Sequence, residues 1–195
     1  FLTYYSNTSW ASFSKISGYL QVLSMVFPIL IGIITSMVVD QEYESGNFQH
    51  LLSSTERKEL SFISKLILSL LLGTLSTILA VVGFYIGFNF IEGNTLPLTM
   101  FLAVVGILIG SNIILYIFHF FLSLRFSKAV SIGVGIIESL VSALFLTGMG
   151  DGRWPFMPCT WSMRFVSSLL IKYENVNIFD PDLSLGIVLS IVGTI

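Results

Sequence analysis

Four long apolar stretches divide the chain, and short polar segments separate them. The hydrocarbon core of a bilayer is about 30 Å thick, and a helix needs about 20 apolar residues to cross it. Each stretch reaches that length, so the pattern predicts four complete membrane spans. They run over about Ile16–Val39, Phe62–Phe90, Met100–Leu124 and Ala129–Met149.

A fifth apolar run, Leu183–Ile195, is too short to cross as it stands. It nevertheless has the start of a helix, because Asp180 can accept hydrogen bonds from free amides and Pro181 suits the first turn. We expect the beginning of another span here. The chain does not start with Met and ends inside an apolar run, so we expect a fragment of a longer protein.

The composition agrees with lipid as the solvent. Hydrophobic residues make up 54% of the chain and charged residues 10%, whereas a soluble domain carries about 25% charged residues. No basic stripe suggests nucleic-acid binding. One cysteine allows neither an intrachain disulfide nor a cysteine metal cluster. No repeat or soluble domain boundary is visible, so residues 1–195 form a single transmembrane domain.

Basic residues near the ends of the spans predict the orientation, because Lys and Arg are retained on the cytoplasmic side. Arg57, Lys58, Lys65, Arg125 and Lys128 lie on one side of the predicted membrane. Four others lie on the opposite side: Lys15, Arg153, Arg164 and Lys172. The bias places the links Asp40–Ser61 and Arg125–Lys128 in the cytoplasm.

Two pairs of glycines are spaced one helical turn apart: Gly83 with Gly87, and Gly106 with Gly110. Small residues at this spacing let helix backbones approach closely in lipid. Packing inside the bundle is the favoured interpretation, and a subunit interface is the alternative.

On the fourth span, Ser131, Gly135, Glu138 and Ser142 share one helical face. Glu138 lies near the middle of the span, where an ionisable group is costly and should face the bundle, a cavity or a partner. Two interpretations stay open. Glu138 either belongs to a substrate or proton pathway, or is a buried glutamate hydrogen-bonded to a neighbouring helix.

Motifs for catalysis are missing from the sequence. His119 lies among phenylalanines near the cytoplasmic end of the third span, where a structural role is expected. No HExxH spacing, nucleophile elbow or nucleophile–base set occurs, so we expect neither an enzyme nor a catalytic or metal site. A phosphate-binding GxxxxGK[ST] loop is also missing. If transport is ATP-driven, another chain must bind the ATP and Mg, and this chain carries no cofactor.

The first cytoplasmic link has a pattern of its own. Gly46 allows a sharp turn, after which Asn47–Leu52 can form a short helix with Phe48, Leu51 and Leu52 on one face. Such a helix either docks onto a partner below the membrane or rests on lipid headgroups, and the physics favours neither.

This link resembles the first cytoplasmic loop of ABC-2-type transporter permeases. The resemblance rests on the pattern Asp40-x-Glu42-x-Glu44-x-Gly46-x-Phe48-x-x-Leu51-Leu52, followed by Arg57 and Lys65. It implies a six-span, all-α permease bundle, of which four full spans and the start of a fifth are present. It also implies a coupling helix that contacts an ABC ATPase subunit. The implied coupling residues are Glu42, Glu44, Gly46, Phe48, Leu51, Leu52 and Arg57.

The long segment at about 150–182 is similar to the outer segment of the lantibiotic-immunity branch of that family. The similarity rests on Gly148-x-Gly150-Asp151-Gly152-x-Trp154-Pro155, followed by Pro158, Trp161 and Arg164. It implies a re-entrant hairpin near the exit of the transport path, and a capping loop is the alternative. Asp151, Trp154, Trp161 and Arg164 join Glu138 as candidates for the substrate path.

The spacing of residues within this segment also predicts its structure without the resemblance. Trp161, Phe165, Leu169 and Tyr173 recur at helical spacing, with Arg164 on another side. This predicts an amphipathic helix that lies at the outer interface or dips into the bundle. Trp154 and Trp161 match the aromatic belt of a membrane interface.

The leading hypothesis is the permease subunit of an ATP-driven exporter that removes a lantibiotic-type, amphiphilic peptide from the bacterial cell membrane. Its expected partners are an ABC ATPase, a second permease and the lipid bilayer, without nucleic acid. Two alternatives remain: an ion-coupled secondary transporter that uses Glu138, and a non-transporting membrane partner subunit.

Overall fold

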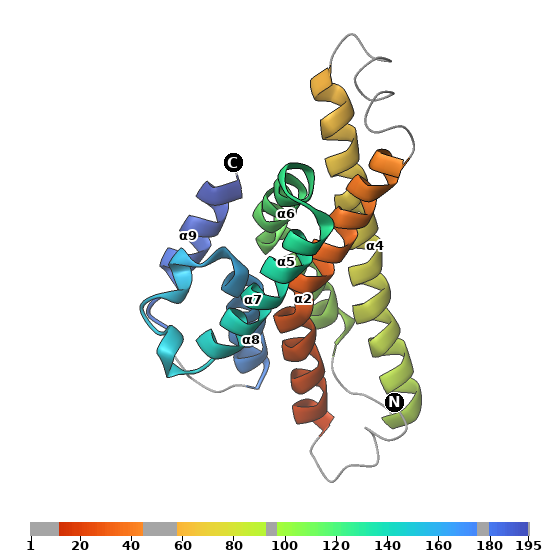
Figure 1. Ribbon diagram of the computed structural model, residues 1–195. Helices are drawn as coiled ribbons and strands as arrows, with labels where there is room; N and C mark the ends of the chain where they lie inside the picture. Colours follow the sequence, from red (N-terminus) through yellow and green to blue (C-terminus); the bar gives the residue numbers. More distant parts are fainter. Residues whose placement is uncertain (1–11, 45–57, 93–96, 175–179, 195) are drawn as a thin grey trace.

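The computed structural model describes residues 12–44, 58–92, 97–174 and 180–194. Within these ranges the chain is built from helices and the short segments that join them (Figure 1). Two long helices, α2 (Ser12–Glu44) and α4 (Lys58–Glu92), run side by side. The helices α5 (Leu98–Ser111), α6 (Ile113–Arg125), α7 (Lys128–Phe145) and α8 (Pro158–Tyr173) pack beside them, and α9 (Leu183–Thr194) follows.

Three of these helices are long and apolar enough to cross a membrane: Ser12–Glu44, Phe62–Ile91 within α4, and Lys128–Phe145. They confirm the first, second and fourth predicted spans, with shifted ends. A fourth span is present if α5 and α6 are counted together. The protein is therefore an all-helical membrane protein, and its described part has three spanning helices or up to four.

The third predicted span is not one straight helix. α5 and α6 meet at an angle of 44°, and Asn112 stands between them. The side-chain amide of Asn112 donates to the Leu108 carbonyl at 2.7 Å, and the Ser111 hydroxyl donates to the Ile107 carbonyl at 2.6 Å. Side chains that bond to the preceding turn compete with the helical ladder and bend it. The hydropathy pattern does not register this break.

α9 begins where the sequence predicts. The carboxylate of Asp180 accepts a hydrogen bond from the amide of Asp182 at 3.0 Å, and the helix follows from Leu183. The predicted cap is confirmed. At 12 residues, α9 is shorter than a span.

The core is organised around α2. In the most apolar stretch of α2, 50% of the residues are buried inside the protein, compared with 22% in the corresponding stretches of α4 and α7. The rings of Tyr19 and Phe84 stack with centroids 3.8 Å apart, and the Tyr19 hydroxyl donates to the Ala80 carbonyl at 3.1 Å. Aromatic packing and a hydrogen bond thus join α2 to α4.

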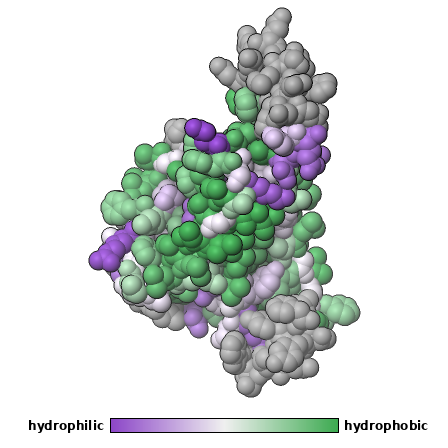
Figure 2. Space-filling model, viewed as in Figure 1, coloured by the Kyte–Doolittle hydropathy of each residue, from purple (hydrophilic) through white to green (hydrophobic). Residues whose placement is uncertain are grey.

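Much of the outer surface is apolar, as Figure 2 shows for one face. Leu71, Leu75 and Leu79 of α4 are each more than half exposed. Surface of this kind would be unfavourable in water, but lipid chains solvate it. The exposed leucines therefore mark the lipid-facing side of α4.

The predicted glycine pairs do not behave as expected. A Cβ built on Gly83, Gly106 or Gly110 would meet no atom within 4 Å in the described part of the chain. Packing inside the bundle is therefore the wrong interpretation for these three, because helix packing requires near contact. The alternative, a subunit interface, stays a prediction.

Candidate functional site

α2 and α7 cross with their backbones close together. A Cβ on Gly135 would lie 2.7 Å from the Pro28 carbonyl oxygen, and one on Gly32 would lie 2.9 Å from the Ser131 carbonyl oxygen. Both positions therefore need glycine for the backbones to approach. The buried residues of α7 are Ser131, Gly135, Ser139 and Ser142. This confirms that the predicted small, polar face of the fourth span points into the bundle.

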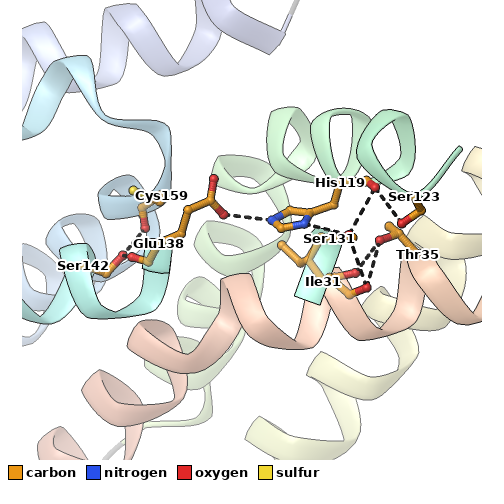
Figure 3. A network of polar contacts seen from close by, with 9 residues as sticks. Ile31, Thr35, His119, Ser123, Ser131, Glu138, Ser142 and Cys159 are labelled. Atoms are coloured by element: carbon orange, nitrogen blue, oxygen red, sulfur yellow. Dashed lines mark hydrogen bonds and ion pairs between the residues drawn. The ribbon is translucent and has the colours of Figure 1, made fainter. Parts of the chain in front are cut away.

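Glu138 lies at the edge of that face and pairs with His119 of α6. Its Oε2 atom is 2.8 Å from Nε2 of the histidine. The histidine side chain is fully buried, whereas 16% of the glutamate side chain is exposed. Figure 3 shows the two side chains meeting between their helices. Glu138 is therefore bonded to a neighbouring helix, as one of the two interpretations predicts, but its side chain is only partly buried. Its role in a substrate or proton pathway stays a prediction.

The other ring nitrogen of His119 makes a second contact with α7, through Ser131. Nδ1 lies 3.0 Å from the hydroxyl oxygen of Ser131. That hydroxyl can donate to the His119 carbonyl at 3.3 Å or to the Gly32 carbonyl at 3.5 Å. The Ser123 hydroxyl also donates to the His119 carbonyl, at 2.9 Å. Residues of α2, α6 and α7 therefore meet around one buried imidazole.

The tautomer of His119 sets the direction of these hydrogen bonds. If Nε2 carries the proton, it donates to Oε2 of Glu138, and Nδ1 accepts from the Ser131 hydroxyl. If Nδ1 carries the proton, it donates to the Ser131 oxygen while that hydroxyl donates to a backbone carbonyl, and the contact of Nε2 with Glu138 then needs a second proton between them. Either arrangement gives both nitrogens of the buried imidazole a partner.

A second polar contact extends the network to α8. The hydroxyl of Ser142 donates to the Cys159 carbonyl at 2.6 Å, and it can also donate to the Glu138 carbonyl at 2.9 Å. Burial raises the pKa of the Cys159 thiol to about 11, and the nearby carboxyl of Glu138 adds to the effect. The thiol is therefore protonated and neutral near pH 7.

The sequence does not predict the partnership of His119 and Glu138. A weak signal exists, since each lies within about three helical turns of the short link at Phe126 and Ser127. Antiparallel helices joined by such a link bring residues of similar depth together. Among the described residues, no three His, Cys, Asp or Glu side chains converge to hold a metal ion. The network can hold and move a proton.

The predicted coupling residues divide into two groups. Glu42 forms an ion pair with Lys65, which ties α2 to α4, and Glu44 is the last residue of α2. The other five lie outside the described residues: Gly46, Phe48, Leu51, Leu52 and Arg57. Their predicted role is untested.

An ion pair joins the two predicted cytoplasmic links. Nζ of Lys128 donates to Oδ2 of Asp40 at 3.1 Å, so the start of α7 is held against the end of α2. The two links therefore lie at the same end of the bundle, as the distribution of Lys and Arg predicts.

At the other end, Arg164 organises the outer segment. Its guanidinium donates to the Phe145 carbonyl at 2.8 Å, to the Thr147 carbonyl at 3.3 Å and to Oδ1 of Asp151 at 2.9 Å. It also lies 5.9 Å from the ring centre of Trp154. Three of the predicted candidates for the substrate path, Arg164, Asp151 and Trp154, are thus brought together here.

The aromatic-belt prediction is wrong for both tryptophans. Trp154 is fully buried and Trp161 is 3% exposed. The Trp154 ring lies so close to Gly186 of α9 that a Cβ there would overlap it. The Trp161 indole donates to the Pro155 carbonyl at 2.8 Å. These rings fill the space between α8 and α9, where glycines on α9 leave room for them.

α8 resolves a choice that the sequence leaves open. It packs against α2, α5 and α7, and its first turns bury residues on several sides, among them Thr160, Ser162, Met163 and Val166. It therefore dips into the bundle and does not lie along the outer interface. The buried Thr160 hydroxyl donates to the Met157 carbonyl at 2.8 Å, whereas the buried Ser167 hydroxyl has no hydrogen-bond partner among the described residues.

Comparisons with models of protein families, with curated proteins and with solved structures find no match to this chain.

Proposed function

We propose that this chain is the permease subunit of an ATP-driven exporter that expels a lantibiotic-type, amphiphilic peptide from the bacterial cell membrane. The observation that supports this most is the length of α2 and α4. They have 33 and 35 residues, so at about 1.5 Å per residue each is about 50 Å long. A bilayer core of about 30 Å cannot cover them. Figure 1 shows α4 rising beyond the rest of the bundle at one end.

That extension is braced. The Glu42–Lys65 pair joins α2 to α4, and the Asp40–Lys128 pair joins α2 to α7. A force applied beyond Glu44 would therefore move three helices together. This is what the predicted coupling link Asp40–Ser61 requires if a separate ABC ATPase pushes on it during ATP hydrolysis.

A second permease is the expected neighbour within the membrane. Gly83, Gly106 and Gly110 leave helix surfaces open, with no atom of the described chain within 4 Å of a Cβ built on them. Glycine surfaces of this kind allow close approach of another helix. They support an assembly of two permeases with the ATPase.

The exposed carboxylate of the outer segment supports the proposal that the substrate is a peptide. Asp151 has 69% of its side chain exposed while it holds Arg164. A cationic peptide at the outer surface would compete for that carboxylate. Trp154 and Trp161 are buried and pack inside the segment. Among the predicted candidates in this segment, Asp151 is therefore the one most accessible to a peptide.

The test is a co-purification combined with a tolerance assay in cells that make the chain together with the ATPase of the same system. Phe48→Asp places a charge on the predicted docking face, and we expect loss of both ATPase recovery and peptide tolerance. Lys172→Asn, an exposed change at the far end of α8, is the control and should preserve both. If Phe48→Asp leaves both readouts at the control level, the coupling function is wrong.

The His119–Glu138 pair favours a second candidate, an ion-coupled secondary transporter. Hydrogen-bonded ionisable side chains on neighbouring helices inside a membrane bundle are the arrangement that proton relays use. This candidate predicts transport that continues without any ATPase and stops in Glu138→Gln. The ATP-driven candidate predicts the opposite dependence on the ATPase, so one deletion strain separates them.

A further inference from the structure

An open cavity lies at the end of the bundle that carries the two ion pairs. It has a volume of about 740 Å³ and is walled by the end of α2, the end of α6 and the start of α7. Ligand pockets commonly have volumes of about 300–1,000 Å³. None of the candidates for the substrate path is among the described residues that line this cavity. It opens beside the Asp40–Lys128 pair, at the start of the predicted coupling link Asp40–Ser61.

The cavity has an apolar wall and a polar rim. Val39, Leu124 and Ile132 form part of the wall. Asp40 and Lys128 stand at the rim with 41% and 50% of their side chains exposed. This order of apolar and charged groups matches an amphiphile whose charged end faces water.

The position of the cavity indicates which amphiphile it is. Lys128 is the first residue of the spanning helix α7, and Asp40 lies in the last turns of α2. The ends of membrane spans lie at the level of lipid headgroups. Tyr43 and Phe126, which also line the cavity, are 57% and 62% exposed, as aromatic side chains are at that level.

Two basic side chains are available to an anion here. Lys128 lines the cavity, and the guanidinium of Arg125 lies 5.8 Å from the ring centre of Phe126, which also lines it. The one acid among the described lining residues is Asp40, which is paired with Lys128. The next acid along α2, Glu42, is paired with Lys65 beside a separate small cavity. Basic pockets between membrane helices bind phosphorylated headgroups.

We propose that this cavity is a binding site for an anionic phospholipid. Its phosphate lies against Lys128 and Arg125, and its acyl chains lie along Val39, Leu124 and Ile132. Binding draws the Lys128 ammonium toward the phosphate and weakens its hold on Asp40. The lipid thereby adjusts how firmly α7 is attached to the end of α2.

Two substitutions that break the same ion pair test this assignment. The purified full-length chain is stripped of lipid and titrated with phosphatidylglycerol or phosphatidylcholine, and native mass spectrometry measures the bound fraction. Lys128→Gln should weaken phosphatidylglycerol binding about fivefold, the ratio that corresponds to about 1 kcal/mol per basic side chain near a membrane surface. Asp40→Asn should strengthen it, because the competing carboxylate is removed while Lys128 stays. Phosphatidylcholine should show neither shift.

Further variants and a competition with inorganic phosphate separate lipid binding from a loss of folding and from binding of a free anion. Arg125→Gln leaves the Asp40–Lys128 pair intact and should still weaken phosphatidylglycerol binding, whereas Lys172→Gln at the far end of α8 should not. If both Lys128→Gln and Asp40→Asn weaken binding, the ion pair only maintains the cavity's shape and the proposal is wrong. If inorganic phosphate displaces phosphatidylglycerol, the ligand is a free anion and the lipid assignment is wrong.

Discussion

Pro28 and Gly135 lie so close across the α2–α7 crossing that a Cβ on the glycine would be 2.7 Å from the proline's carbonyl oxygen. Proline cannot donate a backbone hydrogen bond, and glycine has no side chain to separate the helices. This contact places Ser131 and Glu138 of α7 at the level of His119. The polar network depends on it.

The first prediction concerns this crossing. Gly135→Ala should destabilise the protein by about 1–3 kcal/mol, because the added methyl meets the Pro28 backbone, which cannot yield as a flexible side chain would. Gly133→Ala is the matched control on the same helix, since a Cβ there meets no atom of the described chain within 4 Å. It should be neutral or stabilise by up to about 1 kcal/mol through helix propensity. Unfolding in mixed micelles at increasing SDS fraction measures both, and equal stability of the two variants would contradict the observed crossing.

The second prediction concerns the pair of His119 and Glu138. In a double-mutant cycle of His119→Gln and Glu138→Gln, we expect a coupling energy of about 0.5–3 kcal/mol, as contacting residues show. Each single change leaves one buried group without its partner, so the double variant should be more stable than the sum of the singles implies. Glu174→Gln, at an exposed position after α8, should show no coupling to His119. A coupling near zero for Glu138 would mean that the two side chains do not interact.

The third prediction concerns Arg164. Its guanidinium contacts the Phe145 carbonyl, the Thr147 carbonyl and Asp151 together, and the single ammonium of lysine cannot reproduce that fork. Arg164→Lys should accelerate amide hydrogen exchange in residues 147–157 about tenfold or more, because charged hydrogen bonds are lost. The exposed Arg153 provides the matched Arg153→Lys control, for which exchange should stay at the original rate. Loss of protection in neither variant would show that Arg164 does not hold the segment.

The fourth prediction concerns Cys159. Burial, with the charge of Glu138 as a second cause, raises its thiol pKa to about 11, so at pH 8 about one thiol in a thousand is the reactive thiolate. Maleimide labelling of the folded protein should be at least about 100-fold slower than at a cysteine introduced by Lys172→Cys, which is exposed. Mass spectrometry of the labelled peptides separates the two sites.

The sign of the pH effect gives a second check on Cys159. Because the pKa is raised, labelling should increase steadily as the pH rises toward 11, and unfolding should abolish the difference from the introduced cysteine. Rapid labelling of Cys159 in the folded protein at pH 8 would contradict its burial at the start of α8.

The sequence predicts the parts of this structure that depend on one segment at a time. The long helices, the inward face of α7 and the cap at Asp180 each follow from residues close together in the chain. The shared end of the two cytoplasmic links also follows, because Lys and Arg mark one side of a membrane. Hydropathy reports the average environment of a whole segment. Because lipid requires apolar residues along the length of a span, that average identifies the spans.

Tertiary structure decides the contacts within that frame. His119 and Glu138 meet because two helices have a particular rotation and depth, and hydropathy is insensitive to both. The glycines at 83, 106 and 110 have a second glycine four residues away and remain open, whereas Gly32 and Gly135, which have no such glycine, form the tight crossing. A helix presents several possible faces to its neighbours, and the sum of contacts across the bundle selects one. The sequence therefore determined which segments enter the membrane, and packing determined which side chains meet there.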